Sequence, residues 1–172
     1  MSSRRLLQLI LLVQASIAAG IALAAVRWLD FAPWQGVLLG LVCVALVRLA
    51  INANNFLLST RVASPTPPAF RLGVSGQLRM MAEEFSSSMR LTSWHMPRAR
   101  PHTRIYPGAS LPPVLLLHGY GCNSGYWAQL VPLLDAARIS HATLDLEPLT
   151  GDIDGYAAQI EHGVQALCAQ AG

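Results

Sequence analysis

A glycine-rich loop that follows a short apolar run is the part of this sequence with the clearest chemical potential. The run is Val114–Leu117, and His118, Gly119, Tyr120 and Gly121 come directly after it. Glycines let the chain turn sharply, and backbone N–H groups fixed at the end of a strand stabilise a negatively charged oxygen without reorganising. The pattern therefore indicates a backbone anion site, although a strand-to-helix turn without chemistry also fits it.

Two nucleotide-binding signatures resemble this loop in outline. The stretch GYGCNSG places Ser124 where Gly-x-Gly-x-x-Gly requires its third glycine, and only Asp145 could serve as the later acid. A P-loop is excluded because no Gly-Lys-Ser/Thr follows. A small nucleotide-binding α/β unit stays as an alternative.

Metal ligands and disulfides are not expected. Cys43, Cys122 and Cys168 contain no closely spaced pair, and their odd number argues against a disulfide framework. His95 and His102 stand seven residues apart with no nearby carboxylate, which fits no zinc spacing. We expect no metal and no cofactor.

The elements that must position the loop begin with a strand and a helix. Val114–Leu117 is entirely apolar, as in a parallel strand that is covered on both faces. Ser124 or Asn123 can cap the helix that follows the loop. Pro132 lies within that helix and predicts a kink or a tightened first turn, because proline removes a backbone donor.

A second strand and a second helix complete this segment. Ile139–Leu146 alternates loosely and predicts the strand, and Asp152 or Asp154 can cap a final helix. Its inward side chains are expected to be Tyr156, Ile160, Val164 and Leu167. The order βαβα predicts an α/β layer architecture with right-handed crossovers.

An apolar strand that runs into His118-Gly119-Tyr120-Gly121, a helix with Trp127, and a strand that ends in LDLEP together resemble the N-terminal part of the α/β-hydrolase fold. The resemblance is greatest to bacterial lipases and esterases and covers about residues 112–172. It extends in outline to proteobacterial hydrolases that carry an N-terminal transmembrane hairpin. It implies hydrolysis of an acyl ester, which passes through a tetrahedral oxyanion.

The resemblance also implies roles for the loop residues. The backbone N–H of Tyr120 would donate to the oxyanion, and its side chain would line the acyl pocket. Gly119 and Gly121 would shape the turn, and His118 would hold the loop by a hydrogen bond instead of acting as the catalytic base.

The nucleophile of this fold lies on Gly-x-Ser-x-Gly after the next strand. No serine here has glycine at both −2 and +2, so we expect no nucleophile, acid or base within the 172 residues and no hydrolysis by them alone. The resemblance implies the front part of a hydrolase, with the elbow encoded downstream. The remaining candidates are expected to be solvated surface groups; they are Asp145, Asp152, Asp154 and His162.

The first 60 residues predict a transmembrane hairpin. Residues 6–26 form an uncharged run, and residues 31–51 form a second apolar run, each long enough for a hydrocarbon core of about 30 Å. The connection contains Trp28, Pro33 and Trp34, which suit an interfacial turn. A cleaved signal peptide is the competing interpretation, because Ala22-Leu23-Ala24 fits a cleavage site.

Arginines predict the orientation of the hairpin. Arg4 and Arg5 precede the first span, and most of the remaining arginines follow the second span. By the positive-inside rule, the N-terminus and the C-terminal domain are expected in the cytoplasm, with the hairpin in a bacterial inner membrane.

Residues 61–104 form a basic juxtamembrane zone with seven Arg and two Glu, whereas residues 105–172, the partial hydrolase domain, carry one Arg and six acids. Residues 52–68 predict a linker. Apolar residues at helical spacing predict an amphipathic helix over about Phe70–Arg90, which either packs on the following domain or lies against lipid. The stretches LTSW and HTRIY are expected to be extended, and their prolines suit sheet edges.

The composition limits the expected partners. Of all residues, 53% are hydrophobic and only 12% are charged, which excludes a disordered or nucleic-acid-binding tail. The expected partners are the lipid bilayer and an acyl-ester or lipid substrate. A non-catalytic membrane protein that uses the half-fold as an interaction module is the main alternative; it would require a protein partner.

Overall fold

The computed structural model describes residues 1–172, which form two compact units. One unit comprises Ile10–Met89, and the other comprises Met1–Leu9 together with Arg90–Gly172. These two units are defined by contacts between residues. The three predicted zones, residues 1–60, 61–104 and 105–172, are defined by composition and charge instead, and they stay a prediction. The chain is mostly helical, with two long apolar N-terminal helices and a small three-stranded sheet.

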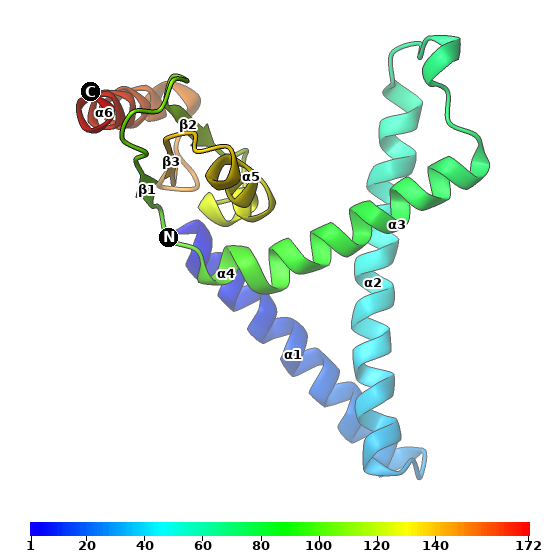
Figure 1. The fold of residues 1–172 in the computed structure, drawn as a ribbon. Helices are drawn as coiled ribbons and strands as arrows, with labels where there is room; N and C mark the ends of the chain where they lie inside the picture. Colours follow the sequence, from blue (N-terminus) through cyan, green and yellow to red (C-terminus); the bar gives the residue numbers. More distant parts are fainter. The chain divides into compact units, whose positions relative to one another are not determined.

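The helices are α1 (Ser3–Trp28), α2 (Pro33–Val62), α3 (Val74–Arg90), α4 (Met96–Arg98), α5 (Val131–Ala136) and α6 (Ile153–Ala171) (Figure 1). Shorter turns of other helical types are η1 (Pro68–Phe70), η2 (Leu91–His95) and η3 (Ser124–Gln129). The strands are β1 (Thr103–Arg104), β2 (Val114–Leu117) and β3 (His141–Leu144).

Helices α1 and α2 are both long and apolar enough to cross a membrane. Their most apolar windows are only 6% and 11% buried, so they are not covered as the core helices of a soluble domain are. In the connection, Asp30 adopts a φ of 53°, and the Gln35 side chain accepts a hydrogen bond from the Ala32 amide at 2.9 Å. Pro33 begins α2, where its missing N–H costs nothing.

Small residues bring α1 and α2 together within the unit Ile10–Met89. A Cβ at Gly36 would lie 2.7 Å from the Ala22 carbonyl oxygen, and one at Gly40 would lie 2.2 Å from the Ala18 carbonyl oxygen. Glycine and alanine at four-residue spacing on both helices allow this close backbone approach, which is the usual way that helices associate in lipid.

Helix α2 is longer than predicted because residues 52–62, expected as a linker, continue it. The Ser59 and Thr60 hydroxyls donate back to the carbonyls of Phe56 and Leu57, at 2.8 and 2.7 Å. These hydrogen bonds keep polar residues compatible with a helix. The predicted amphipathic helix is confirmed as α3, which begins at Val74 instead of Phe70.

The prediction that LTSW is extended was wrong, because η2 continues the helical path of α3 as a single π-type turn. The Met96 amide donates to the Leu91 carbonyl. Pro97 has no N–H for the Ser93 carbonyl, and the Arg98 guanidinium donates to that carbonyl instead, at 3.4 Å. A widened turn next to proline is a common way to resolve this conflict.

The sheet has the order β1-β3-β2, in which β2 and β3 are parallel and β1 is antiparallel to β3. Val114 pairs with His141 and Leu117 with Leu144. The two parallel strands, β2 and β3, lie within their predicted ranges, and HTRIY supplies the edge strand β1 as predicted. Helix α6 covers one face of the sheet, and η3 and α5 lie on the other side (Figure 1).

The connections follow the predicted signals closely. The helix after the loop is split into η3 and α5, with Pro132 in the first turn of α5. Asn123 caps η3 and Asp152 caps α6, each by accepting a hydrogen bond from a backbone N–H. Leu167 is buried as expected, but Val164 is 43% exposed, so its predicted inward position was wrong.

Candidate functional site

The glycine-rich loop forms a tight turn at the carboxyl end of β2. The Cys122 amide donates to the Gly119 carbonyl at 3.2 Å, and Gly121 has a φ of +75°. A positive φ at the third residue is the mark of a type II turn, where glycine is favoured. The turn's backbone hydrogen bonds leave the N–H groups of Tyr120 and Gly121 unused, as its geometry requires.

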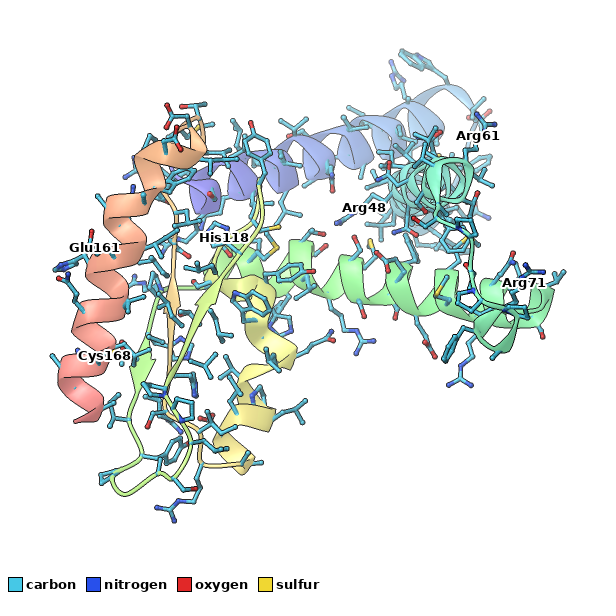
Figure 2. All side chains as sticks on the ribbon, turned by 90° about the horizontal axis from the view of Figure 1, so that it is seen from above. Arg48, Arg61, Arg71, His118, Glu161 and Cys168 are labelled. Carbon is cyan, nitrogen blue, oxygen red and sulfur yellow. The ribbon has the colours of Figure 1, made fainter.

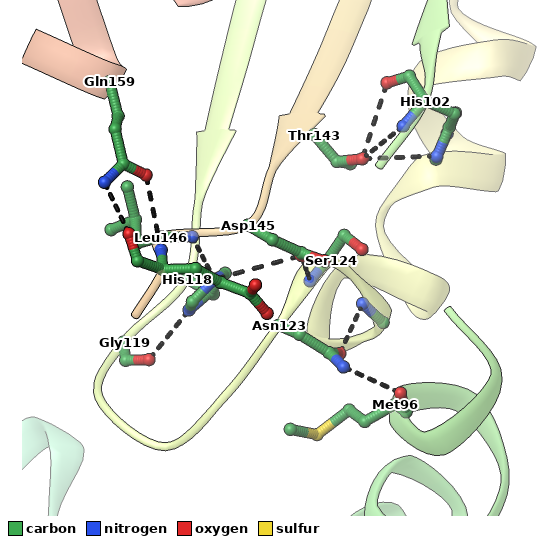
Figure 3. Close-up of polar contacts among 12 residues, drawn as sticks. Met96, His102, His118, Gly119, Asn123, Ser124, Thr143, Asp145, Leu146 and Gln159 are labelled. Atoms are coloured by element: carbon green, nitrogen blue, oxygen red, sulfur yellow. Dashed lines mark hydrogen bonds and ion pairs between the residues drawn. The ribbon is translucent and has the colours of Figure 1, made fainter. Parts of the chain in front are cut away.

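His118 joins this loop to the end of β3. Its side chain is 3% exposed; Nε2 accepts a hydrogen bond from the Leu146 amide at 3.0 Å, and Nδ1 lies 2.9 Å from the Gly119 carbonyl oxygen (Figure 3). Because Nε2 accepts, Nδ1 must carry the proton and donate. Both ring nitrogens are thus engaged in holding backbone groups, and neither is free to take a proton from a substrate.

Asp145 lies in the same network (Figure 3). Its Oδ1 accepts a hydrogen bond from the Ser124 amide at 2.6 Å and lies 4.0 Å from His118 Nε2. The carboxylate therefore satisfies a donor at the start of η3. The expectation that Asp145 is a solvated loop acid was wrong, because its side chain is only 16% exposed.

Asn123 was not predicted to have more than a capping role, but its side chain is fully buried. Nδ2 donates to the Met96 carbonyl at 2.7 Å, and Oδ1 accepts from the Gly125 amide at 3.0 Å. The backbones of η3 and α4 approach so closely here that a Cβ at Gly125 would lie 2.6 Å from Met96 Cα. The amide of Asn123 bridges two segments that are far apart in the sequence.

A pocket of about 300 Å³ opens beside the loop. The loop residues from His118 to Gly121 form one wall, and the segment after β3 with the first turns of α6 forms the other. Of its apolar lining, Tyr156 and Ile160 were predicted as inward side chains of the final helix, whereas Leu146, Leu149 and Ile153 were not predicted. A pocket at the carboxyl end of parallel strands is the usual ligand site of an open α/β sheet.

Hydrogen bonds fix the second wall of the pocket. Gln159 on α6 donates to the Glu147 carbonyl at 2.6 Å and accepts from the Glu147 amide at 3.3 Å. The Tyr156 hydroxyl donates to the Pro148 carbonyl. These contacts hold the segment after β3 against α6.

Asp152, Asp154 and His162, which were expected to be solvated, are exposed and take no part in the hydrogen bonds around His118. Asp152 caps α6, and Glu161 is exposed on the outer side of α6 (Figure 2). Cys122 follows the turn directly, but burial raises the pKa of its thiol, which disfavours the nucleophilic thiolate. No three metal-ligating side chains come together in the structure.

Comparisons with family models, with characterised proteins and with solved structures found no match to this chain. The loop, the pocket and the two apolar helices are therefore the features from which we infer a function.

Proposed function

We propose that the unit around the sheet is the N-terminal part of a lipase- or esterase-like α/β hydrolase, and that the chain is anchored in a membrane by α1 and α2. One observation carries this proposal: a type II turn at the carboxyl end of β2 leaves the Tyr120 amide unbonded, beside a pocket with an apolar lining. The hydrolase pattern takes one oxyanion-hole donor from a strand-to-helix loop of this kind.

The proposed chemistry divides between the amide and the pocket. In ester hydrolysis the carbonyl oxygen becomes negatively charged, and a fixed N–H such as that of Tyr120 stabilises the charge where it develops. A pocket of about 300 Å³ has the volume of about ten groups the size of water, which suits a short or medium acyl chain. His118 acts by holding the loop through its two hydrogen bonds.

The proposal assigns no nucleophile to these residues, because no Gly-x-Ser-x-Gly sequence occurs among them. It assigns oxyanion stabilisation and acyl binding only. We therefore expect no turnover of a p-nitrophenyl ester by the 172 residues, and an active preparation would refute this part of the proposal.

The membrane assignment is the second half of the proposal. The excess of arginine in the first turn of α1 and after the apolar part of α2 favours a cytoplasmic location for both ends of the chain, in a bacterial inner membrane. Apolar side chains exposed along both helices would contact lipid.

The test uses hexanoate, whose carboxylate carries negative oxygen on a short acyl chain. The full chain in detergent is labelled with ¹⁵N, and the Tyr120 amide is followed during titration with hexanoate or with acetate. We expect a saturable downfield shift with hexanoate and a weaker response to acetate, because only hexanoate fills the pocket.

Two matched substitutions locate the response. Ile153→Ser changes an exposed pocket residue and should weaken the hexanoate response, whereas Leu133→Ser changes a comparably exposed residue of α5 and should leave it unchanged. A Tyr120 amide that does not respond to hexanoate would contradict the proposal.

A further inference from the structure

A second pocket, of about 290 Å³, lies between η2, α4 and the start of η3, away from the pocket beside Tyr120. Its basic groups come from Arg98, Arg100, His95 and His102, and no acidic side chain lines it. A cavity with cationic groups and no acid attracts an anion, because a concave surface lined by charges of one sign concentrates the positive potential. The function proposed above makes no use of this pocket.

Arg98 is held in a fixed position at the edge of this pocket. Its guanidinium carbon lies 3.7 Å from the centre of the Trp94 ring, and Nη1 donates to the carbonyls of Ser93 and Trp94 at 3.4 and 3.2 Å. These contacts occupy one nitrogen of the guanidinium group. Nε and Nη2 keep the planar pair of donors that binds phosphate or carboxylate oxygens in a bidentate manner.

Ser124 provides an independent observation that points to a ligand. The residue lines the pocket and is 4% exposed, yet its hydroxyl has no hydrogen-bond partner. Leaving a buried hydroxyl without a partner is unfavourable, so native structures rarely do it without a reason. An oxygen of an anionic ligand would accept the Ser124 O–H and relieve this cost.

The place of the pocket in the chain indicates where the anion comes from. Gln8, in the second turn of α1, donates from Nε2 to the Pro97 carbonyl at 2.9 Å, one residue before Arg98. Helix α1 has 26 residues and a length of about 39 Å, which exceeds a hydrocarbon core of about 30 Å. The uncharged run of α1 begins at Leu6, so Gln8 lies within one turn of its N-terminal end, next to the headgroup region of the proposed span, and α4 is tied to it.

We propose that the pocket formed by Arg98, Arg100, His102 and Ser124 binds the phosphate group of an anionic phospholipid headgroup. The two arginines supply charge-assisted hydrogen bonds, the Ser124 hydroxyl supplies a neutral donor, and the exposed ring of Trp94 lies at the mouth, where indole rings favour the membrane interface. The choice of a lipid as the source rests on the proposed insertion of α1 and α2, but the binding of a phosphate monoester does not.

The test measures binding of dihexanoyl phosphatidic acid to the full chain in non-ionic detergent by titration calorimetry. Dihexanoyl phosphatidylcholine and inorganic phosphate are measured in parallel. We expect saturable binding of phosphatidic acid, at least about tenfold weaker binding of the zwitterionic lipid, and competition by inorganic phosphate only at higher concentration.

Substitutions separate the pocket from general attraction by positive charge. The double substitution Arg98→Gln with Arg100→Gln should weaken phosphatidic acid binding by about tenfold or more. Arg61→Gln with Arg71→Gln removes the same charge at two residues that do not line the pocket and should leave binding unchanged. Equal loss in both double variants, or no loss in either, would overturn the pocket assignment.

Two further results test the lipid source and the membrane anchor separately. If inorganic phosphate binds as tightly as phosphatidic acid, the lipid source is overturned. Extraction of membranes with alkaline carbonate tests insertion separately: release of the chain would contradict the membrane anchor, whatever the titration gives.

Discussion

Asn123→Asp should destabilise the unit around the sheet in a pH-dependent manner. The substitution keeps Oδ1 as the acceptor for the Gly125 amide but replaces Nδ2, which donates to the Met96 carbonyl at 2.7 Å. The Met96 carbonyl then faces a second oxygen, and a carboxylate is placed where Asn123 is fully buried. An unsatisfied buried carbonyl costs about 1–3 kcal/mol, and an unpaired buried charge brings the total to about 3–5 kcal/mol.

The sign of the pH dependence follows from the protonation states. Burial disfavours the carboxylate, so the introduced acid has a pKa above its unfolded value of about 3.9. The folded state then binds more protons than the unfolded state, and stability falls as the pH rises through this range. At lower pH the protonated acid can donate to the Met96 carbonyl, and most of the loss should be recovered.

Thermal unfolding of the full chain in detergent, followed by near-ultraviolet circular dichroism, measures this effect at about pH 7.5 and about pH 5. A loss of about 3 kcal/mol corresponds to a decrease in Tm of about 10 °C at the higher pH, and a much smaller one at the lower pH. Gln129→Glu makes the same change of amide to acid at an exposed position of η3 and should move Tm little at either pH. A decrease for Asn123→Asp that is equal at both pH values, or absent, would contradict the role of the buried Asn123 amide as a donor to Met96.

Three further predictions concern the hairpin, the cysteines and the orientation. Gly40→Ala places a Cβ 2.2 Å from the Ala18 carbonyl oxygen and should destabilise the hairpin in detergent by about 1–3 kcal/mol. The control Gly20→Ala, whose added Cβ would have no atom within 4 Å, should not destabilise it. Equal effects of the two substitutions on thermal unfolding would argue against the close packing of α1 and α2. Burial raises the pKa of Cys122, so iodoacetamide at about pH 8 should alkylate the exposed Cys168 before Cys122. Peptide mass mapping measures the order of modification, and earlier modification of Cys122 would contradict the prediction. A C-terminal fusion should fluoresce with green fluorescent protein and be inactive with periplasmic alkaline phosphatase, and the opposite pattern would reverse the proposed orientation.

Local sequence patterns predicted the elements around the site well. The apolar run at Val114–Leu117 forms a parallel strand, Pro132 divides a helix, and Asp152 caps α6. Each of these signals acts over a few residues, because strand burial, proline geometry and capping depend on immediate neighbours. The turn at Gly121 was also predicted from a local signal, because glycines directly after a strand favour a turn with a positive φ.

Contacts between distant segments could not be predicted in the same way. Asn123 bonds to Met96, 27 residues earlier, and Asp145 bonds to Ser124, 21 residues earlier. A polar residue in a loop is usually solvated, and no local pattern marks the one that is buried by a partner from elsewhere. The widened turn at Leu91–His95 was missed because its cause lies in the Pro97 and Arg98 that follow.

The loop's proposed role is tested most directly by the ¹H–¹⁵N resonance of the Tyr120 amide during a hexanoate titration, compared in the unsubstituted chain and in Gly121→Val. Valine disfavours the φ of +75° that the turn requires at Gly121. We expect a saturable downfield shift in the unsubstituted chain and its loss in Gly121→Val, with the sheet resonances of Val114–Leu117 unchanged. A Tyr120 resonance that ignores hexanoate, or responds equally in both chains, would contradict the assignment of this turn to oxyanion binding.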